Sequence, residues 1–299
     1  MPEAQPYLLS KPDLARHFGA AAASYQSVNR IQKIVLQRLL ERLQLVKIQP
    51  RRILDLGSGP GVSAKQLARQ YRRADIIELD ISAQMLKQSA RSTFRLLSRR
   101  QHLCTDAEQL SLASQSAELV FSNLMLQWCN DLDRAFAEVS RCLKNNGLFM
   151  FSTFGPDTLI ELRKSWQQVD DAVHVNAFVD MHDIGDALIR AGFENPVMET
   201  EKIVIRYDSA MTLMRDLKAL GANNVNSGRR RGLTGKNSLQ KMLAEYEKWR
   251  EEDRLPATYE VVYGHAWLPE ASRARRIDEN TLGFPVAALK SRRPSAESR

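Results

Sequence analysis

The sequence contains few cysteines, and their arrangement argues against two classes of protein. Cys104, Cys129 and Cys142 are odd in number and scattered, with no Cys-x-x-Cys pair. This pattern excludes a disulfide framework and argues against a cysteine-ligated metal. The five histidines show no ligand spacing either. We therefore interpret the cysteines as reduced core thiols of a cytoplasmic protein, and we expect no metal site.

Long apolar runs are absent as well. No run approaches the length of a membrane span, and the amino terminus lacks the apolar core of a signal peptide. The hydrophobic content of 43% is ordinary for a globular protein, and 299 residues can bury one large core with a smaller cap. We expect no membrane association, and we expect a monomer.

Negative charge is in deficit, because 43 Lys and Arg outnumber 35 Asp and Glu for a formal net charge of +8. Part of the excess lies in residues 269–299, which we expect to be a basic, mobile tail. No aromatic-basic interleaving or nucleic-acid docking motif occurs, so nucleic acid is not the expected partner. An acidic protein partner suits this charge better.

The most informative stretch is Arg52-Ile-Leu-Asp-Leu-Gly-Ser-Gly-Pro-Gly61, an apolar strand that ends in three glycines at alternate positions. Glycine lets such a turn bend sharply and lets a ligand lie against bare backbone. A helical pattern follows at 62–71, so the amides of its first turn would face that ligand. We predict a nucleotide-cofactor loop, although the spacing is not the Gly-x-Gly-x-x-Gly of NAD and FAD sites. A Gly-rich turn without function is the alternative.

Three further landmarks follow in order. Asp80 ends a second strand about twenty residues on, where a ribose-binding acid belongs. Asp106 ends a third strand, and Asn123 lies at the end of a fourth. With Asp-x-Ser-x-x-Met-Leu after the second strand, the chain resembles the class I S-adenosylmethionine-dependent methyltransferases. The resemblance implies an S-adenosyl-L-methionine site, the product S-adenosyl-L-homocysteine, and these cofactor-binding residues: Asp55, Gly57, Ser58, Gly59, Gly61, Asp80, Ile81, Met85, Asp106, Ala107 and Asn123.

Strand and helix patterns alternate along the first half, which predicts a parallel, doubly wound sheet. The expected fold is α/β, with a Rossmann-like seven-stranded class I methyltransferase sheet and an inserted helical substrate cap. We predict strands near 52–56, 75–79, 102–105, 118–122, 147–153, 203–207 and 260–267. We predict helices within 12–45 and near 62–71, 82–97, 131–144, 156–169, 180–191, 209–220 and 236–252. The expected units are cofactor-covering helices at 1–45, a cofactor-binding core at 46–154, the remaining sheet with its cap at 155–268, and the tail at 269–299.

The second half carries a more specific resemblance. Phe154-Gly-Pro-Asp-Thr-Leu-Ile-Glu-Leu-Arg163, Phe178-Val-Asp-Met-His-Asp-Ile-Gly185 and Ala257-Thr-Tyr-Glu-Val-Val-Tyr-Gly-His-Ala266 resemble the malonyl-acyl carrier protein O-methyltransferases of biotin synthesis. The resemblance covers roughly residues 10–290. It implies methylation of the free carboxylate of a malonyl thioester on acyl carrier protein, giving an ester that primes pimeloyl synthesis. It also implies an active-site role for Tyr25.

A carboxylate of this kind is already ionised at neutral pH, so the reaction requires no general base. The protein must align the reactants, and one cation plus a tyrosine hydroxyl would suffice to locate the carboxylate. The candidate positioning residues are Tyr25, His182, Arg206 and Tyr207. The candidate substrate- or carrier-docking residues are Phe178, Tyr259, His265, Arg229, Arg230 and Arg231.

Each candidate has a plainer interpretation. His182 could cap a surface helix, and Arg206 with Tyr207 could be an ordinary edge pair. Trp128 and Phe178 are more typical of a core than of a substrate platform. The three arginines could be a solvated loop. Asp55 could accept amides of its own loop.

Rival functions exist on the same fold. A complex I assembly family, which hydroxylates a protein arginine, shares the Thr-Leu-x-Glu-Leu-Arg and Ala-Thr-Tyr stretches. It lacks Asp-Met-His, and this chain has no Arg-rich, acid-poor presequence. A methyltransferase of a different small carboxylate is a second rival, and a cofactor-binding assembly protein without turnover is a third.

Overall fold

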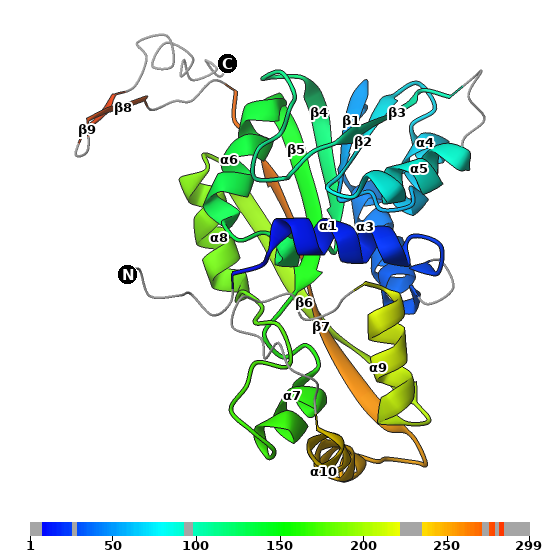
Figure 1. Cartoon of the computed structure of the whole chain (residues 1–299). Coiled ribbons are helices and arrows are strands. Elements are labelled where there is room, and N and C mark those ends of the chain that lie inside the picture. Colours follow the sequence, from blue (N-terminus) through cyan, green and yellow to red (C-terminus); the bar gives the residue numbers. More distant parts are fainter. Residues whose placement is uncertain are drawn as a thin grey trace, which may run out of the picture.

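The computed structural model describes residues 8–25, 29–92, 98–221 and 235–270, together with the backbone of two strands at 275–278 and 281–283. The fold is built on one seven-stranded sheet in the order β3-β2-β1-β4-β5-β7-β6 (Figure 1). The predicted seven-stranded α/β architecture is confirmed. The strands are β1 Arg52–Leu56, β2 Asp75–Asp80, β3 Arg100–Cys104, β4 Ala117–Asn123, β5 Leu143–Phe154, β6 Glu194–Tyr207 and β7 Leu255–Trp267.

Strand direction divides the sheet into two parts. β1 to β5 pair in parallel, as predicted, whereas β7 runs antiparallel to both β5 and β6. The sequence predicted parallel pairing for the first half of the chain and gave no direction for the last two strands. Because β1, β2 and β4 are parallel, their carboxyl ends meet at one edge, and the loops that follow them lie side by side.

Two buried layers enclose the sheet. One contains side chains of α3 (Arg30–Leu45), α4 (Val62–Gln70) and the later helices α7 (Ile160–Gln167), α9 (Ala210–Ala219) and α10 (Lys236–Glu247). The other contains side chains of α6 (Leu132–Cys142) and α8 (Met181–Arg190). Successive residues of β1 alternate between the layers, with Ile53 in the first and Leu54 in the second. This period of two explains why each central strand reads as a nearly continuous apolar run.

Helix starts follow local capping chemistry. Ser10 Oγ accepts the Asp13 amide at the start of α1 (Lys11–Ala21), and Ser82 caps α5 (Ala83–Arg91) by accepting from Met85. Asp131 and Ser209 cap α6 and α9 in the same way. Such side-chain acceptors satisfy amides that have no partner within the helix.

The β6–β7 pair extends past the carboxyl edge of the central sheet. β5 ends at Phe154 opposite Val261, whereas β7 is paired with β6 as far as Leu255 and Tyr207. Helices α7, α9 and α10 lie around this extension (Figure 1). They form a helical insertion in the predicted place, and its action as a substrate cap stays a prediction.

Three details differ from the sequence predictions. β6 begins at Glu194, well before the predicted start. The prediction missed the first part of the strand because this exposed edge strand carries charges instead of alternating apolar residues. Cys104 is exposed at the end of edge strand β3 and Cys129 is only half-buried, so Cys142 alone is a core thiol. Within the predicted tail, the backbones of 275–278 and 281–283 pair as β8 and β9, and the rest of 271–299 lies outside the described residues.

Candidate active site

The loop between β1 and α4 has the backbone that its three glycines predict. Gly57, Gly59 and Gly61 all have positive φ, of 74°, 54° and 80°. A side chain at Gly57 would collide with Met125, and one at Gly61 would collide with Ser89 and Arg100. A Cβ at Gly59 would meet no atom within 4 Å. Gly59 therefore opens onto free space, whereas Gly61 serves close packing.

Asp80, at the end of β2, holds this loop in place. Its Oδ2 accepts the Gly59 amide at 2.9 Å, and its Oδ1 accepts the Ser82 amide at 2.8 Å. Burial raises the pKa of Asp80 to about 6, although the two amide bonds oppose the shift. Each carboxylate oxygen still has a lone pair for a further donor. Asp80 is thus placed to accept hydroxyl groups of a ligand that lies beside Gly59.

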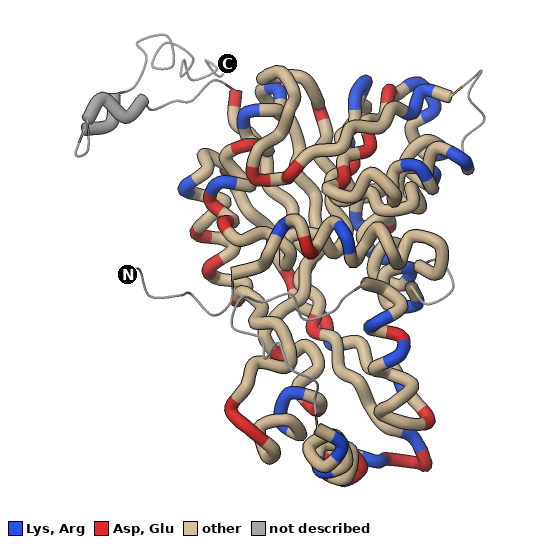
Figure 2. The backbone as a smooth tube through the Cα atoms, viewed as in Figure 1, with Lys and Arg blue, Asp and Glu red and all other residues tan. Residues whose placement is uncertain are grey.

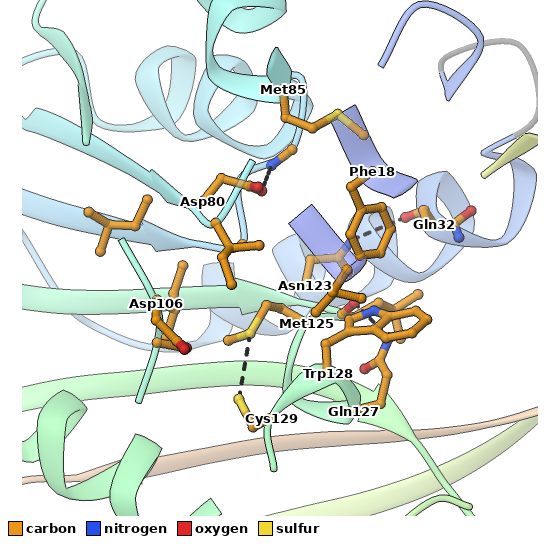
Figure 3. A pocket seen from close by; sticks show the side chains of 18 of the residues that line it. Phe18, Gln32, Asp80, Met85, Asp106, Asn123, Met125, Gln127, Trp128 and Cys129 are labelled. Carbon is orange, nitrogen blue, oxygen red and sulfur yellow. Dashed lines mark hydrogen bonds between the residues drawn. The ribbon is translucent and has the colours of Figure 1, made fainter. Parts of the chain in front are cut away.

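A cavity lies at the carboxyl ends of β1, β2 and β4 and encloses about 870 Å³ of space, part of it open to solvent. Figure 3 shows Asp80, Asp106 and Asn123 around it. The predicted cofactor residues that line it are Gly57, Gly59, Asp80, Ile81, Met85, Asp106, Ala107 and Asn123, and Tyr25 joins them.

The remaining predicted cofactor residues lie just outside that space. Ser58 lines a smaller adjoining cavity, which Gly59 also lines. Asp55 is buried and accepts from Ser63 Oγ at 2.5 Å. It therefore holds the first turn of α4 and does not accept the amides of its own loop, which was its plainer interpretation. Burial raises the pKa of Asp55 to about 7, against the effect of the Ser63 bond.

Helix α1 crosses the cavity and is fastened by Lys11. The Lys11 ammonium lies 3.2 Å from Asp106 Oδ1 and 2.5 Å from Glu108 Oε1, and it donates to the Trp128 carbonyl at 3.3 Å. Burial lowers the pKa of Lys11, but the hydrogen bond to Glu108 and the charges of Asp106 and Glu108 outweigh it and hold the pKa above its ordinary value. The charge is therefore kept, and α1 is tied to the loop that follows β3.

Further contacts hold both ends of this helix. Asn130 and Leu9 exchange two hydrogen bonds, of 2.7 and 3.0 Å, just before α1. Past its other end, Ser24 Oγ donates to the Ala219 carbonyl of α9 at 3.1 Å. Phe18 packs edge-on against Trp128 with ring centroids 5.2 Å apart (Figure 3). Helix α1 thus covers the cavity.

Several lining residues were not predicted from the sequence. They come from α1, from α3, from the end of β5 and from the short helix η1 (Leu126–Trp128) after β4. Trp128, interpreted as a core residue, is half-buried and lines the cavity. Helices covering the cofactor site were predicted at 1–45, but the helical pattern does not say which of their faces meets a ligand. The unpredicted residues include Lys11, Phe18, Gln32, Gln127 and Phe154.

A second cavity adjoins the first, with Gln127 and Cys129 lining both. Its walls are mostly apolar and include Leu9, Leu126 and Phe178. Phe178 packs edge-on against Phe154, whose ring lines the first cavity, with centroids 5.7 Å apart. The predicted docking residue Phe178 is therefore next to the cofactor cavity and not in the core.

The other predicted positioning residues lie elsewhere. The His182 side chain is 84% exposed and pairs with Asp180 at the start of α8, as its capping interpretation suggests. Arg206 is exposed and pairs with Glu251. Tyr207 and Tyr259 form a hydrogen-bonded pair, and burial raises the pKa of both. None of these residues, nor His265, lines either cavity in the part of the chain that the structure describes.

Tyr25 is the exception among those candidates. It lines the first cavity, and burial, followed by the negative charge of Asp80, raises the pKa of its hydroxyl. The hydroxyl therefore stays protonated and can donate. Arg229, Arg230 and Arg231 lie outside the described residues.

The described residues contain no group of three or more His, Cys, Asp or Glu side chains that could hold a metal ion. Among the same residues, no helix combines the length and apolar character that crossing a membrane requires.

Comparisons with known proteins agree with this geometry. Residues 54–151 match the family described as "Methyltransferase domain". The chain is 50% identical over 273 residues to the malonyl-[acyl-carrier protein] O-methyltransferase of Methylovorus sp. (strain MP688), covering 90% of this chain and 92% of that protein. It is 47% identical to the protein of the same name from Gallionella capsiferriformans (strain ES-2), covering 90% and 94%.

A solved structure supports the fold alone. The phosphoethanolamine N-methyltransferase 2 of Haemonchus contortus, in complex with S-adenosyl-L-methionine, matches with a TM-score of 0.53 and 16% identity. The match covers 84% of this chain and 57% of that one. The chain is thus an α/β methyltransferase in fold, with a cavity where the glycine loop and the acid after β2 meet.

Proposed function

The chain belongs to the malonyl-[acyl-carrier protein] O-methyltransferase family, and on that premise we propose that it methylates the free carboxylate of malonyl-acyl carrier protein with S-adenosyl-L-methionine. The observation that carries the proposal is the extent of the similarity. It runs beyond the methyltransferase domain at 54–151 and includes the helices around β6 and β7. A match restricted to the cofactor half would support methyl transfer without indicating the acceptor.

The residues of the first cavity fit S-adenosyl-L-methionine. Gly59 leaves open space beside the loop, Asp80 can accept from ribose hydroxyls, and Asp106 lies where an adenine amino group would need an acceptor. Both hydrogen bonds that the Asp106 carboxylate accepts end on its Oδ1, from Lys11 and from the Glu108 amide, which leaves Oδ2 available among the residues described. The cofactor supplies an electrophilic methyl group when bound.

The second cavity suits the acceptor. We place the malonyl thioester arm along its apolar walls, with the carboxylate directed to the junction at Gln127 and Cys129. Among the described residues that line the two cavities, Lys11 is the only cation, and three partners already hold it. A carboxylate at the junction would thus meet no free cation there, and its lone pairs would stay nucleophilic. Removal of water from it would raise its reactivity further.

Cys129 is a competing nucleophile at that junction, and its surroundings suppress it. Burial raises the pKa of the Cys129 thiol to about 12, although Lys11 opposes the shift. The thiolate, not the thiol, is the reactive form. At neutral pH the malonyl carboxylate is ionised whereas Cys129 is not, so the methyl group passes to the substrate and not to the protein.

The product follows from the same chemistry. Esterification hides the charge of the malonyl group, and we propose that the ester primes the pimeloyl chain of biotin. The acidic carrier protein is the proposed partner of this basic chain.

Intact-mass analysis tests the proposal. Purified protein, S-adenosyl-L-methionine and malonyl-carrier protein should yield a carrier heavier by one methylene unit. Acetyl- and butyryl-carrier proteins are matched controls, because they have no free carboxylate and should stay unchanged. Methylation of those controls would contradict carboxylate attack. Gain of an oxygen atom on an arginine-containing partner would favour the hydroxylase alternative.

A further inference from the structure

Gln127 lies where the two cavities meet, and its side-chain amide is held in one orientation. It is the middle residue of η1 and lines both cavities (Figure 3). Its Nε2 donates to the Leu124 carbonyl at 2.7 Å, and its Oε1 accepts from the Thr153 hydroxyl at 3.1 Å. A backbone carbonyl can only accept, so the nitrogen of the amide, and not its oxygen, faces Leu124.

The turn that presents the Leu124 carbonyl is strained. Leu124 has a φ of 53°, in the left-handed region that residues with a side chain rarely adopt. Its amide donates to Ser152 of β5, to the carbonyl at 3.0 Å and to Oγ at 3.1 Å. Ser152 is fully buried, and its Oγ donates in turn to Asn123 Oδ1 at 3.0 Å. Strained backbone that the surrounding structure holds in place is concentrated at functional sites.

One hydrogen of the Gln127 amide has no acceptor among the hydrogen bonds of the described residues. A primary amide has two N–H donors, and the bond from Nε2 to Leu124 uses one of them. The thiol of Cys129, the other residue shared by the two cavities, lies 3.9 Å from the Met125 sulfur. Gln127 therefore offers a fixed, neutral donor at the junction.

A neutral donor suits a carboxylate that must act as a nucleophile. A hydrogen bond to an ionised oxygen is stronger than one between neutral groups, so a single amide can hold the carboxylate in place. That bond occupies one oxygen and leaves the other free. Lys11 would bind a carboxylate as a tight ion pair, but three other groups already engage it.

We propose that Gln127 Nε2 donates to one oxygen of the malonyl carboxylate and so directs the other oxygen to the methyl group. The inference rests on the proposed function. The second oxygen forms the new bond to the methyl carbon, the sulfur of the cofactor takes the electron pair of the bond that breaks, and no proton moves. Thr153 is a positioning residue, because its hydroxyl holds the Gln127 amide.

Calorimetry with two carriers tests the proposal, on protein saturated with S-adenosyl-L-homocysteine so that no reaction occurs. Malonyl- and acetyl-carrier protein share the docking surface and the thioester arm, so the difference between their affinities measures what the carboxylate contributes. Gln127→Met keeps the length of the side chain and removes the donor. It should weaken binding of the malonyl carrier by about tenfold, since a bond to a charged group is lost. Binding of the acetyl carrier should change less than about twofold.

Two further variants test the two halves of the arrangement. Thr153→Val keeps the shape of residue 153 and frees the Gln127 amide, so it should weaken the malonyl carrier alone, by about threefold. Gln127→Glu keeps an acceptor for Thr153 and brings a negative charge to the junction. It should reverse the preference, so that the acetyl carrier binds more tightly than the malonyl carrier.

Cys129→Ala is the matched control at the same junction and should keep the wild-type preference for the malonyl carrier. Unchanged preference in Gln127→Met and Gln127→Glu would overturn the inference. An equal loss for both carriers would also overturn it, because Gln127 would then support the cavity as a whole. A loss in Cys129→Ala as large as that in Gln127→Met would assign the carboxylate to the thiol instead. A wild-type protein that does not methylate malonyl-carrier protein would contradict the proposed function.

Discussion

Gly59 differs from the other two glycines of its loop in what surrounds it. A methyl group there would meet nothing in the protein and would project into the cavity. We predict that Gly59→Ala destabilises the fold by only about 1 to 2 kcal/mol, the cost of a side chain at positive φ. Affinity for S-adenosyl-L-homocysteine should fall by more than about tenfold, since a ligand-contacting backbone surface is covered.

Gly192 offers a matched control for that variant. It too has positive φ, of 87°, and a Cβ there also meets nothing within 4 Å, but it lies after α8, away from both cavities. Gly192→Ala should lose similar stability in thermal unfolding and keep its affinity in calorimetry. Equal affinities of the two variants would show that Gly59 faces no ligand.

The raised pKa of Asp80 predicts that cofactor binding depends on pH. Its pKa is raised to about 6 by burial, and only the ionised form offers acceptors to two ribose hydroxyls. Affinity should be flat above about pH 7 and should decrease as the pH falls through about 6. In the free protein, the raised pKa means that protonated Asp80 stabilises the fold, so stability changes with pH in the opposite direction to affinity. This stabilising contribution of Asp80 is full below about pH 4 and is lost as the pH rises through about 6.

Comparison with Asp80→Asn isolates this residue, because buried Asp55 has a pKa of about 7 and stays in both proteins. Calorimetric affinity of the variant, although weaker, should lose the decrease centred near pH 6. A variant that keeps the wild-type pH profile would assign that profile to Asp55 or another group.

The spacing of residues along the sequence predicted the site residues of the glycine loop and of the strand ends. It could not predict site residues that come from distant parts of the sequence. Gly57, Gly59 and Asp80 are set by the turn after β1 and the end of β2. Lys11 contacts Asp106, which lies 95 residues further along the sequence, and no local sequence pattern indicates that contact. The misplaced candidates His182 and Arg206 have the right chemistry, but their side chains pair with acids at the surface.

At the scale of elements, α1 is the part whose attachment can be tested. Lys11→Met keeps the apolar stem and removes the ammonium that joins α1 to Asp106 and Glu108. The Leu9–Asn130 bonds stay, so the helix should loosen and not detach. We predict faster dissociation of the cofactor product, by up to about tenfold, with a smaller change in association.

Arg16→Met is the control on the same helix. Arg16 is 70% exposed and pairs only with Asp13 within α1 among the contacts described, an arrangement that contributes little. Stopped-flow quenching of tryptophan fluorescence, to which Trp128 beside Phe18 contributes, measures both rates. Equal dissociation rates for the two variants would mean that Lys11 does not hold helix α1 over the cavity.

Strands could be predicted wherever burial requires a regular pattern of apolar residues in the sequence. β1 and β4 are almost wholly buried, and their apolar runs matched the observed bounds closely. β6 is an edge strand, and its Glu199 and Glu201 pair with Arg42 and Arg38 of α3 instead of packing in a core. Its register depends on β7, so only the partner strand reveals its full length.

At the scale of the whole molecule, charge is the property most relevant to an acidic carrier. Figure 2 shows Lys and Arg distributed over many elements and often close to acids. The general excess could attract a carrier to any face, whereas docking needs charge at one place. The three arginines at 229–231 are the place that the sequence predicts, and they lie outside the described residues.

A pair of charge reversals separates these possibilities. Changing Arg229, Arg230 and Arg231 to Glu should raise the KM for malonyl-carrier protein by about tenfold or more at low salt, and should flatten its salt dependence. Turnover of malonyl-coenzyme A should change little, because that substrate is small and does not need the carrier surface. The control changes Arg51, Arg72 and Arg73 to Glu.

The control alters net charge by the same amount at the opposite edge of the sheet. These three exposed arginines precede β1 and β2, and so lie at the amino ends of strands whose carboxyl ends meet the cavity. If docking is local, the control keeps the wild-type KM. If both triple variants raise the KM equally, attraction is a property of total charge, and residues 229–231 have no special role in binding the carrier.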